Sequence, residues 1–214
     1  MEFIDKELQQ YIEDHTEPES ELLRKLNRET NAKVMMPRML SGHLQGRVLS
    51  MLSHMIQPKQ ILEIGTYTGY SALCLAEGMQ PGGTLHTIDI NDELEDLVKR
   101  YITEAGLEGQ VKQYVGDALE IIPTLTETFD LVFIDADKIN YANYYNMVID
   151  KVRPGGYIIA DNVLWSGKVL EKYRKKLDKD TEAILNFNKQ VHDDERVQNV
   201  LFPIRDGLMV LRKK

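Results

Sequence analysis

The chain has 214 residues, of which 43% are hydrophobic and 28% are charged, a composition typical of a soluble globular protein. This length suffices for one α/β domain with a substantial core and is short for two domains. The formal net charge of -8 disfavours a large nucleic-acid surface, because neutralising phosphates requires clustered Lys and Arg. The one cysteine, Cys74, excludes an intramolecular disulfide and suits a reducing compartment.

Two kinds of targeting or membrane segment are not expected. Residues 1–12 mix apolar and charged positions and lack the apolar centre of a signal peptide. No apolar run approaches the ~20 residues that a membrane span needs. We therefore expect a cytoplasmic protein with no membrane partner.

The first 57 residues predict a helical elaboration of the domain. Apolar positions near helical spacing, from Phe3 and Ile4 to Leu8, Tyr11 and Ile12, predict a first helix. A second helix is expected to begin near residue 18 and a third to cover residues 46–56, with a loop over residues 34–43.

Strands and helices alternate in the rest of the chain. Apolar runs predict strands over residues 60–64, 84–88, 111–115, 131–134 and 157–160, with helices beginning near residues 69, 92, 118 and 141. This alternation predicts a parallel sheet that is covered by helices on both faces. Residues 197–203 and 208–211, separated by Arg205-Asp206-Gly207, predict an antiparallel pair at the C-terminal end.

A glycine loop after the first strand predicts a cofactor site. Gly65 lets the backbone turn sharply and approach a ligand closely. The next strand ends at Asp89, where an acidic side chain can accept hydrogen bonds from ribose hydroxyls. The alternative is that Gly65 and Gly69 only form an ordinary turn between a strand and a helix.

The residues around this loop favour S-adenosylmethionine over a dinucleotide. Tyr67 and Tyr70 stand where a dinucleotide loop has glycines, and these bulky residues would obstruct a pyrophosphate. Glu63 adds negative charge where an anion would be repelled. S-adenosylmethionine carries an ammonium and a sulfonium group but no phosphate, so it tolerates that charge.

Polar residues at two further strand ends predict a metal site. Asp135 follows the strand over residues 131–134, and Asp161 and Asn162 follow the strand over residues 157–160. Adjacent parallel strands lie ~4.8 Å apart, so these oxygen ligands converge. They suit Mg²⁺, or else Mn²⁺ or Ca²⁺, while the lack of His and Cys disfavours zinc. The alternative is that each Asp only caps a helix.

Several segments together resemble a known family. ILEIGTYTGYSALCLA, FDLVFIDADKINYANYY and VRPGGYIIADNVLWSGKV are similar to segments of the class I S-adenosylmethionine-dependent O-methyltransferases of the caffeoyl-CoA and catechol type, in a bacterial branch. The resemblance implies one methyltransferase domain over residues 1–214, usually in a homodimer. It also implies a Rossmann-like, seven-stranded, mostly parallel sheet with an antiparallel C-terminal strand and N-terminal helices.

The resemblance also implies the roles of individual residues. A divalent cation would bind Asp135, Asp161 and Asn162, and Lys138 would be catalytic together with Asp135. By its position alone, Lys138 would be a solvated surface lysine. The implied cofactor contacts are Ser41, Glu63, Gly65, Thr66, Ser71, Asp89, Ala118 and Asp135.

The expected reaction is methyl transfer to a small vicinal diphenol. The cation would grip two neighbouring oxygens and lower the pKa of one phenol, and Lys138 would take its proton or stabilise the phenolate. The chain differs from the plant enzymes at Ser166, where they carry Asn. It also differs from the animal catechol enzymes near Val200, where they carry Glu. These differences concern the substrate and not the chemistry.

Two other functions remain open at this point. One is methylation of a hydroxylated uridine in transfer RNA, and the other is ligand binding without catalysis on the same fold. The basic residues between Lys168 and Lys179 are interpreted as a solvated helix face, although they could meet an anionic substrate such as a CoA ester or RNA.

The remaining conspicuous side chains are interpreted as structural, with one exception. Tyr141, Tyr144 and Tyr145 are expected in the core, and Cys74 is expected to be a buried thiol. Trp165 is expected to line the substrate pocket.

Overall fold

The computed structural model describes residues 4–214, so Phe3 of the first predicted helix lies outside the described residues. The helices are α1 (Lys6–Asp14), α2 (Glu21–Lys33), α3 (Gly42–Ile56), α4 (Tyr70–Ala76), α5 (Glu95–Glu104), α6 (Ala118–Ile121), α7 (Tyr141–Val148) and α8 (Lys179–Asp193). Short 3₁₀ helices are η1 (Pro37–Met39), η2 (Asp92–Leu94), η3 (Ile122–Thr124), η4 (Lys138–Asn140), η5 (Ile149–Lys151), η6 (Trp165–Gly167) and η7 (Glu171–Tyr173).

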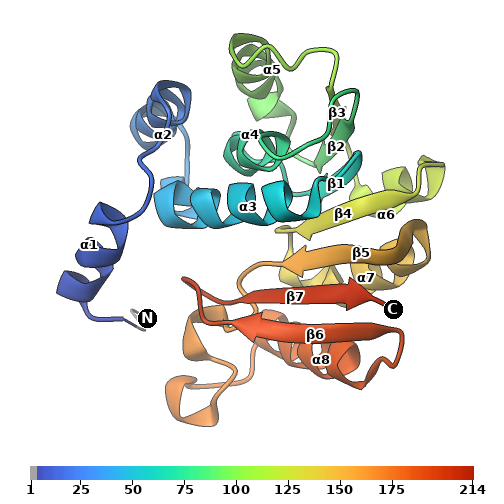
Figure 1. The fold of residues 1–214 in the computed structure, drawn as a ribbon. Helices are drawn as coiled ribbons and strands as arrows, with labels where there is room; N and C mark the ends of the chain where they lie inside the picture. Colours follow the sequence, from blue (N-terminus) through green and yellow to red (C-terminus); the bar gives the residue numbers. More distant parts are fainter. Residues whose placement is uncertain (1–3) are drawn as a thin grey trace.

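The strands are β1 (Gln60–Ile64), β2 (Thr84–Asp89), β3 (Val111–Val115), β4 (Phe129–Ile134), β5 (Val152–Ala160), β6 (Val197–Phe202) and β7 (Leu208–Lys213). Within residues 4–214 they form one seven-stranded sheet in the order β3-β2-β1-β4-β5-β7-β6. Strand β7 pairs antiparallel with both β5 and β6, and its arrow in Figure 1 points opposite to theirs. The predicted fold class is therefore confirmed.

The central strands are apolar on both faces because helices cover both. In β4, Leu131, Val132, Phe133 and Ile134 are all fully buried, which is the pattern of a strand inside a doubly covered sheet. One face packs against a core that includes residues of α2, α3, α4 and α5. The other face packs against residues of α6, α7 and α8. Continuous apolar runs rather than alternating ones thus follow from the helices on either side.

The order of the strands reverses beside β1. The chain moves from β1 outward to β2 and β3 and then returns to β4, on the other side of β1. Backbone hydrogen bonds continue past the strand ends, from Asp135 N to Ile64 O at 2.8 Å and from Asp161 N to Ile134 O at 3.0 Å. The residues after β1, β4 and β5 therefore lie side by side at the switch point where such sheets bind ligands.

The N-terminal helices differ in how they meet the sheet. Helix α1 contains no buried residue, and Figure 1 shows it apart from the sheet, on the side to which the arrows of β4, β5 and β6 point. Helix α3 begins at Gly42, four residues earlier than expected. It packs closely on α4, because a Cβ at Gly46 would lie 2.6 Å from the Tyr70 ring. Among residues 4–214, no helix is long and apolar enough to cross a membrane.

The basic segment before α8 is not a helix face, so that prediction is wrong. Residues 168–178 contain only the short η7, and α8 begins at Lys179 after Asp178, whose side chain accepts a hydrogen bond from Thr181 N. Asp178 also pairs with Lys168 at 3.3 Å, and Arg174 donates to the carbonyl of Lys168. These contacts hold the segment in place, and not the backbone hydrogen bonds of a helix.

Candidate active site

Gly65 allows the backbones that follow β1 and β4 to approach each other closely. It directly follows β1 and has a φ of +103°, and a Cβ there would overlap the carbonyl oxygen of Asp135, which directly follows β4. Any other residue would force β1 and β4 apart at their tips. The glycine expected for an approach to a ligand is thus also required for the approach of two strands.

The loop after Gly65 is attached to the end of β2. The Tyr67 amide donates to Asp89 Oδ2 at 2.7 Å, and the Asn91 amide donates to Asp89 Oδ1 at 2.9 Å. Each carboxylate oxygen keeps further acceptor capacity, so Asp89 can also accept from a ligand hydroxyl. The Tyr67 hydroxyl donates to the carbonyls of Met35 and Met36, which places the N-terminal segment beside the loop.

Glu63 is fully buried and accepts two short hydrogen bonds. Ser71 Oγ donates to its Oε1 and Thr87 Oγ1 donates to its Oε2, both at 2.5 Å. Burial is the main reason why the pKa of Glu63 rises to about 8, and the charges of Asp135 and Asp89 raise it further. Burial therefore favours the neutral form of this carboxyl group in the protein alone. In that form, Glu63 repels an anion less than a charged carboxylate would.

The other predicted cofactor residues lie close to the same edge. Thr66 follows Gly65 and is 1% exposed, with its hydroxyl 2.5 Å from that of Thr87. Ala118 begins α6 shortly after β3. Ser41 immediately precedes α3, and its carbonyl accepts a hydrogen bond from Arg205.

Asp135 and Asp161 follow Ile134 and Ala160, which are paired residues of β4 and β5. Asp161 is only 2% exposed, and its oxygens accept hydrogen bonds from the Gln45 side chain, through Nε2, and from the backbone N–H of Asn162, each at 2.7 Å. Burial first, and then the charge of Asp135, raise the pKa of Asp161 well above its ordinary value. Two mutually repelling carboxyl groups thus meet at this edge of the sheet.

The structure brings the predicted metal ligands to one place without deciding their role. Asn162 follows Asp161 directly and has a φ of +58°. In the part of the chain that the structure describes, no three His, Cys, Asp or Glu side chains form a metal-ligating group. The predicted set contains only two carboxylates, completed by the Asn162 amide, and it stays a prediction.

Lys138 is buried, so the alternative of a solvated surface lysine is wrong. Its Nζ lies 3.1 Å from Asp135 Oδ1 and donates to the Tyr141 hydroxyl at 2.5 Å. The same Nζ is 5.9 Å from the centre of the Trp165 ring. The Tyr141 hydroxyl in turn donates to the carbonyl of Asp161 at 3.0 Å. Lys138 is thus held between the ends of β4 and β5 rather than extended into water.

The three tyrosines of α7 are core residues, as predicted. Tyr141, Tyr144 and Tyr145 are each at most 4% exposed. Cys74 is buried as well, which was also expected. Trp165 is partly buried and packs against the core, and its role as a substrate wall stays a prediction.

Three polar contributions were not predicted from the sequence. Gln45 contacts Asp161, Arg205 contacts Gln45, and Tyr141 contacts Lys138 through its hydroxyl. Gln45 lies just before the helix that was predicted over residues 46–56, so no sequence pattern marked it. Arg205 was noted only as part of a turn.

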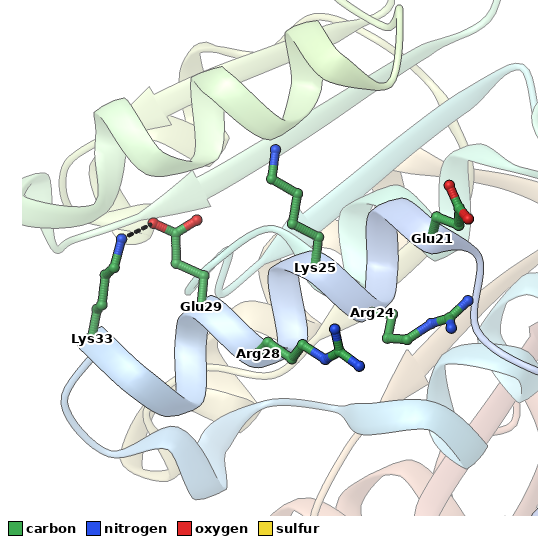
Figure 2. Close-up of a pocket in the computed structure, with 6 residues that line it drawn as sticks. All are labelled: Glu21, Arg24, Lys25, Arg28, Glu29 and Lys33. Atoms are coloured by element: carbon green, nitrogen blue, oxygen red, sulfur yellow. Dashed lines mark hydrogen bonds and ion pairs between the residues drawn. The ribbon is translucent and has the colours of Figure 1, made fainter.

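A surface hollow of about 450 Å³ lies elsewhere, along α2. Figure 2 shows Arg24 and Arg28 on one side of this helix and Lys25, Glu29 and Lys33 on the other. Lys33 pairs with Glu29 at 3.1 Å, and Lys25 pairs with Glu104 at 2.6 Å. No predicted site residue lines this hollow, so we place the candidate active site at the strand ends.

Comparison with known proteins decides the family. Residues 13–214 match the family model described as O-methyltransferase. The chain belongs to the O-methyltransferase family. It is 35% identical over 207 residues to caffeoyl-CoA O-methyltransferase 5 of Nicotiana tabacum, covering 92% of this chain and 85% of that protein. The predicted family and enzyme class are therefore confirmed.

Solved structures of the family have the same fold. The O-methyltransferase from Bacillus cereus, in complex with SAH, superposes with a TM-score of 0.88 at 28% identity and 97% coverage of both chains. The O-methyltransferase TomG from Streptomyces achromogenes, in complex with SAM, superposes with a TM-score of 0.87 at 28% identity, covering 97% of this chain and 96% of TomG.

The buried Glu63 generates a prediction about stability and pH. Its pKa of about 8 in the folded protein exceeds the ordinary value of 4.5, so between these values the unfolded chain has released a proton that the folded chain retains. The free energy of unfolding should therefore fall as pH rises from about 5 to about 8. Glu63→Gln should remove the contribution of Glu63 to this fall, which is on the order of a few kcal/mol, and should leave a shallower curve because the pKa of Asp161 is also raised. Urea unfolding of the ligand-free protein across this pH range measures it.

Glu95→Gln, at an exposed position of α5, is the matched control and should follow the pH curve of the parent protein. Parallel curves for the parent protein and Glu63→Gln would show that Glu63 is not protonated in the folded state.

Proposed function

We propose that the protein transfers a methyl group from S-adenosylmethionine to one hydroxyl oxygen of a small vicinal diphenol, with the help of a divalent cation. The observation that carries this proposal is the arrangement of Asp135, Asp161, Asn162 and the buried Lys138 at adjoining strand ends, beside the Gly65 loop.

S-adenosylmethionine supplies, when bound, an electrophilic methyl group on a sulfonium. The support for this cofactor is that relatives 28% identical to this chain were solved with SAH and with SAM. Asp89 can bind the ribose hydroxyls, and the crowded loop with Tyr67 leaves little room for a pyrophosphate. Burial of Glu63, with its raised pKa, favours a ligand that brings a positive charge near this carboxyl group.

The chemistry of the donors at the neighbouring strand ends fits a divalent cation. Asp135, Asp161 and Asn162 offer only hard oxygen ligands, which suit Mg²⁺ first and Mn²⁺ or Ca²⁺ as alternatives. Asp161 is 2% exposed and faces the charge of Asp135, so a cation held by both would relieve their repulsion. When bound, such a cation lowers the pKa of a hydroxyl group that it contacts and fixes two adjacent oxygens.

Lys138 holds or moves the proton of the reacting hydroxyl in this proposal. Its Nζ is held in place by Asp135 and by the Tyr141 hydroxyl. The side chain therefore loses little conformational entropy when it meets the reacting hydroxyl. An ammonium at that place stabilises a phenolate, and a neutral amine takes the phenolic proton. Trp165 beside it offers an aromatic wall for a planar substrate.

A transfer RNA substrate is the second candidate, and a non-catalytic binding protein is the third. Basic side chains between Lys168 and Lys179 favour the RNA. However, Lys168 pairs with Asp178, and Arg174 contacts backbone carbonyls of its own segment. These contacts, together with a net charge of -8, favour the small substrate.

We also propose that the protein forms a homodimer in the cytoplasm. Apolar side chains are exposed on α1 at Leu8 and Tyr11, and on α3 at Met51 and Met55, and a second copy would bury such surface. The free, buried Cys74 suits a reducing compartment. Light scattering at micromolar concentration should return twice the chain mass of 24.6 kDa, and a single chain mass would contradict the dimer.

Methyl-transfer assays in parallel test the proposed function. Caffeic acid as a catechol, caffeoyl-CoA as a phenolic CoA ester, and hydroxyuridine-bearing tRNA should be compared with Mg²⁺ and with excess chelator. The catechol should give the highest kcat/KM, because two adjacent oxygens on one ring match a cation with two free neighbouring positions. Chelator should abolish the turnover.

A kcat/KM for tRNA that exceeds the catechol value tenfold or more would overturn the phenol assignment. Full activity in chelator would overturn the role of the cation. Cofactor binding without turnover on any substrate would favour the non-catalytic alternative.

Lys138→Ala should lower kcat and kcat/KM together by about 100-fold or more, since general acid–base groups contribute on that scale. The affinity for S-adenosylmethionine, measured by calorimetry, should change little. The matched control is Lys168→Ala, because Lys168 Nζ also lies near the Trp165 ring, at 5.6 Å, but is partly exposed. An unchanged kcat in Lys138→Ala, or an equal loss in the control, would refute the catalytic role.

A further inference from the structure

A chain of hydrogen bonds reaches Asp161 from two distant parts of the sequence. Arg205, in the connection between β6 and β7, donates through Nη1 to Gln45 Oε1 at 3.1 Å. Gln45, in the first turns of α3, donates through Nε2 to Asp161 Oδ2 at 2.7 Å. Gln45 is fully buried, so these contacts are shielded from water.

The guanidinium holds the Gln45 amide in the orientation that suits Asp161. An Arg side chain has donors only, so it must meet the amide oxygen. The amide nitrogen is then directed at Asp161 and can only donate to it. The Asp161 carboxylate accepts only, so it selects the same orientation, and without Arg205 it would be the one remaining side-chain partner in this chain of contacts that does so.

The second oxygen of Asp161 is held from another direction. Asp161 Oδ1 accepts a hydrogen bond from the backbone N–H of Asn162 at 2.7 Å, so both carboxylate oxygens have a protein donor. Two donors fix the plane of the carboxylate, and each oxygen keeps a free acceptor position. A ligating carboxylate held in this way needs no reorientation when a cation arrives.

Arg205 is itself well anchored. The same Nη1 donates to the carbonyls of Leu40, at 3.1 Å, and Ser41, which closely precede α3. The backbone of Arg205 is left-handed, with a φ of +49°, within the turn that Gly207 completes. The side chain therefore ties the β6–β7 connection to the start of α3, and it keeps two partners if Gln45 is replaced.

We infer that Gln45 is a positioning residue that orients the Asp161 carboxylate for the cation, and that Arg205 holds the Gln45 amide in place for this role. This inference rests on the proposed cation at Asp135, Asp161 and Asn162, and it extends that site to α3 and to the β6–β7 connection. Neither residue touches substrate in this scheme.

The test is the affinity of the full-length protein for Mn²⁺, measured from the electron paramagnetic resonance signal of the free ion. Gln45→Met keeps the length and volume of the side chain and removes the donor to Asp161. It should weaken Mn²⁺ binding tenfold or more, the scale found for groups that orient metal ligands. Affinity for S-adenosylhomocysteine should stay within about twofold, because Asp161 is not among the predicted cofactor contacts.

Ser53→Ala is the matched control on the same helix. It removes a buried hydrogen bond to the carbonyl of Leu75, at 2.6 Å, which lies outside this network. Its Mn²⁺ affinity should equal that of the parent protein, and urea unfolding should show that both variants are folded. Equal weakening in Ser53→Ala and Gln45→Met would reduce the role of Gln45 to general stability and overturn the inference.

Arg205→Met tests whether Arg205 acts through Gln45. Arg205 is more exposed than Gln45, so its replacement disturbs the fold less. It should weaken Mn²⁺ binding in the parent protein and have little further effect in Gln45→Met, because both act through one contact. The same loss in both backgrounds would overturn the role of Arg205. Unchanged Mn²⁺ affinity in Gln45→Met overturns the positioning role while leaving the cation proposal intact. A parent protein that binds no Mn²⁺ overturns the cation proposal and this inference with it.

Discussion

The contact between Gly65 and the backbone of Asp135 is the constraint on which the site depends. Adjacent parallel strands can bring their ends together only where no side chain intervenes, and Gly65 leaves that space empty at the junction of β1 and β4. The strand order reverses at this junction, so the loop after β1 and the acidic residues after β4 and β5 face the same region. The predicted cofactor residues and the predicted metal ligands therefore lie along the same edge of the sheet.

Buried ionisable groups meet at this edge, and each is stabilised differently. Glu63 has hydroxyl donors but no cationic partner among residues 4–214, so burial raises its pKa and favours the neutral form. Lys138 remains buried beside a carboxylate and a tyrosine hydroxyl. Asp161 has an amide donor and a backbone donor but faces the charge of Asp135. Such a set is costly for a fold to bury and is typical of sites that bind charged ligands.

Segments from both ends of the chain complete the edge. The N-terminal segment contacts the loop after β1 through the hydroxyl of Tyr67, and α3 reaches Asp161 through Gln45. The connection between β6 and β7 then reaches α3 through Arg205. The helical elaboration before the first strand is therefore part of the candidate site and not only an addition to the sheet.

By itself, the sequence determined the sheet, the strand ends and the family. Apolar runs mark the strands because their two faces are buried, and motifs such as DADK follow those runs without interruption. Only the tertiary structure decided that Lys138 is buried, that burial raises the pKa of Glu63, and that residues 168–178 are not a helix. It also decided that Gln45 meets Asp161 and that Arg205 meets Gln45. Local patterns report which face a residue occupies, whereas desolvation and hydrogen bonds between residues over 100 positions apart depend on packing that no local pattern encodes.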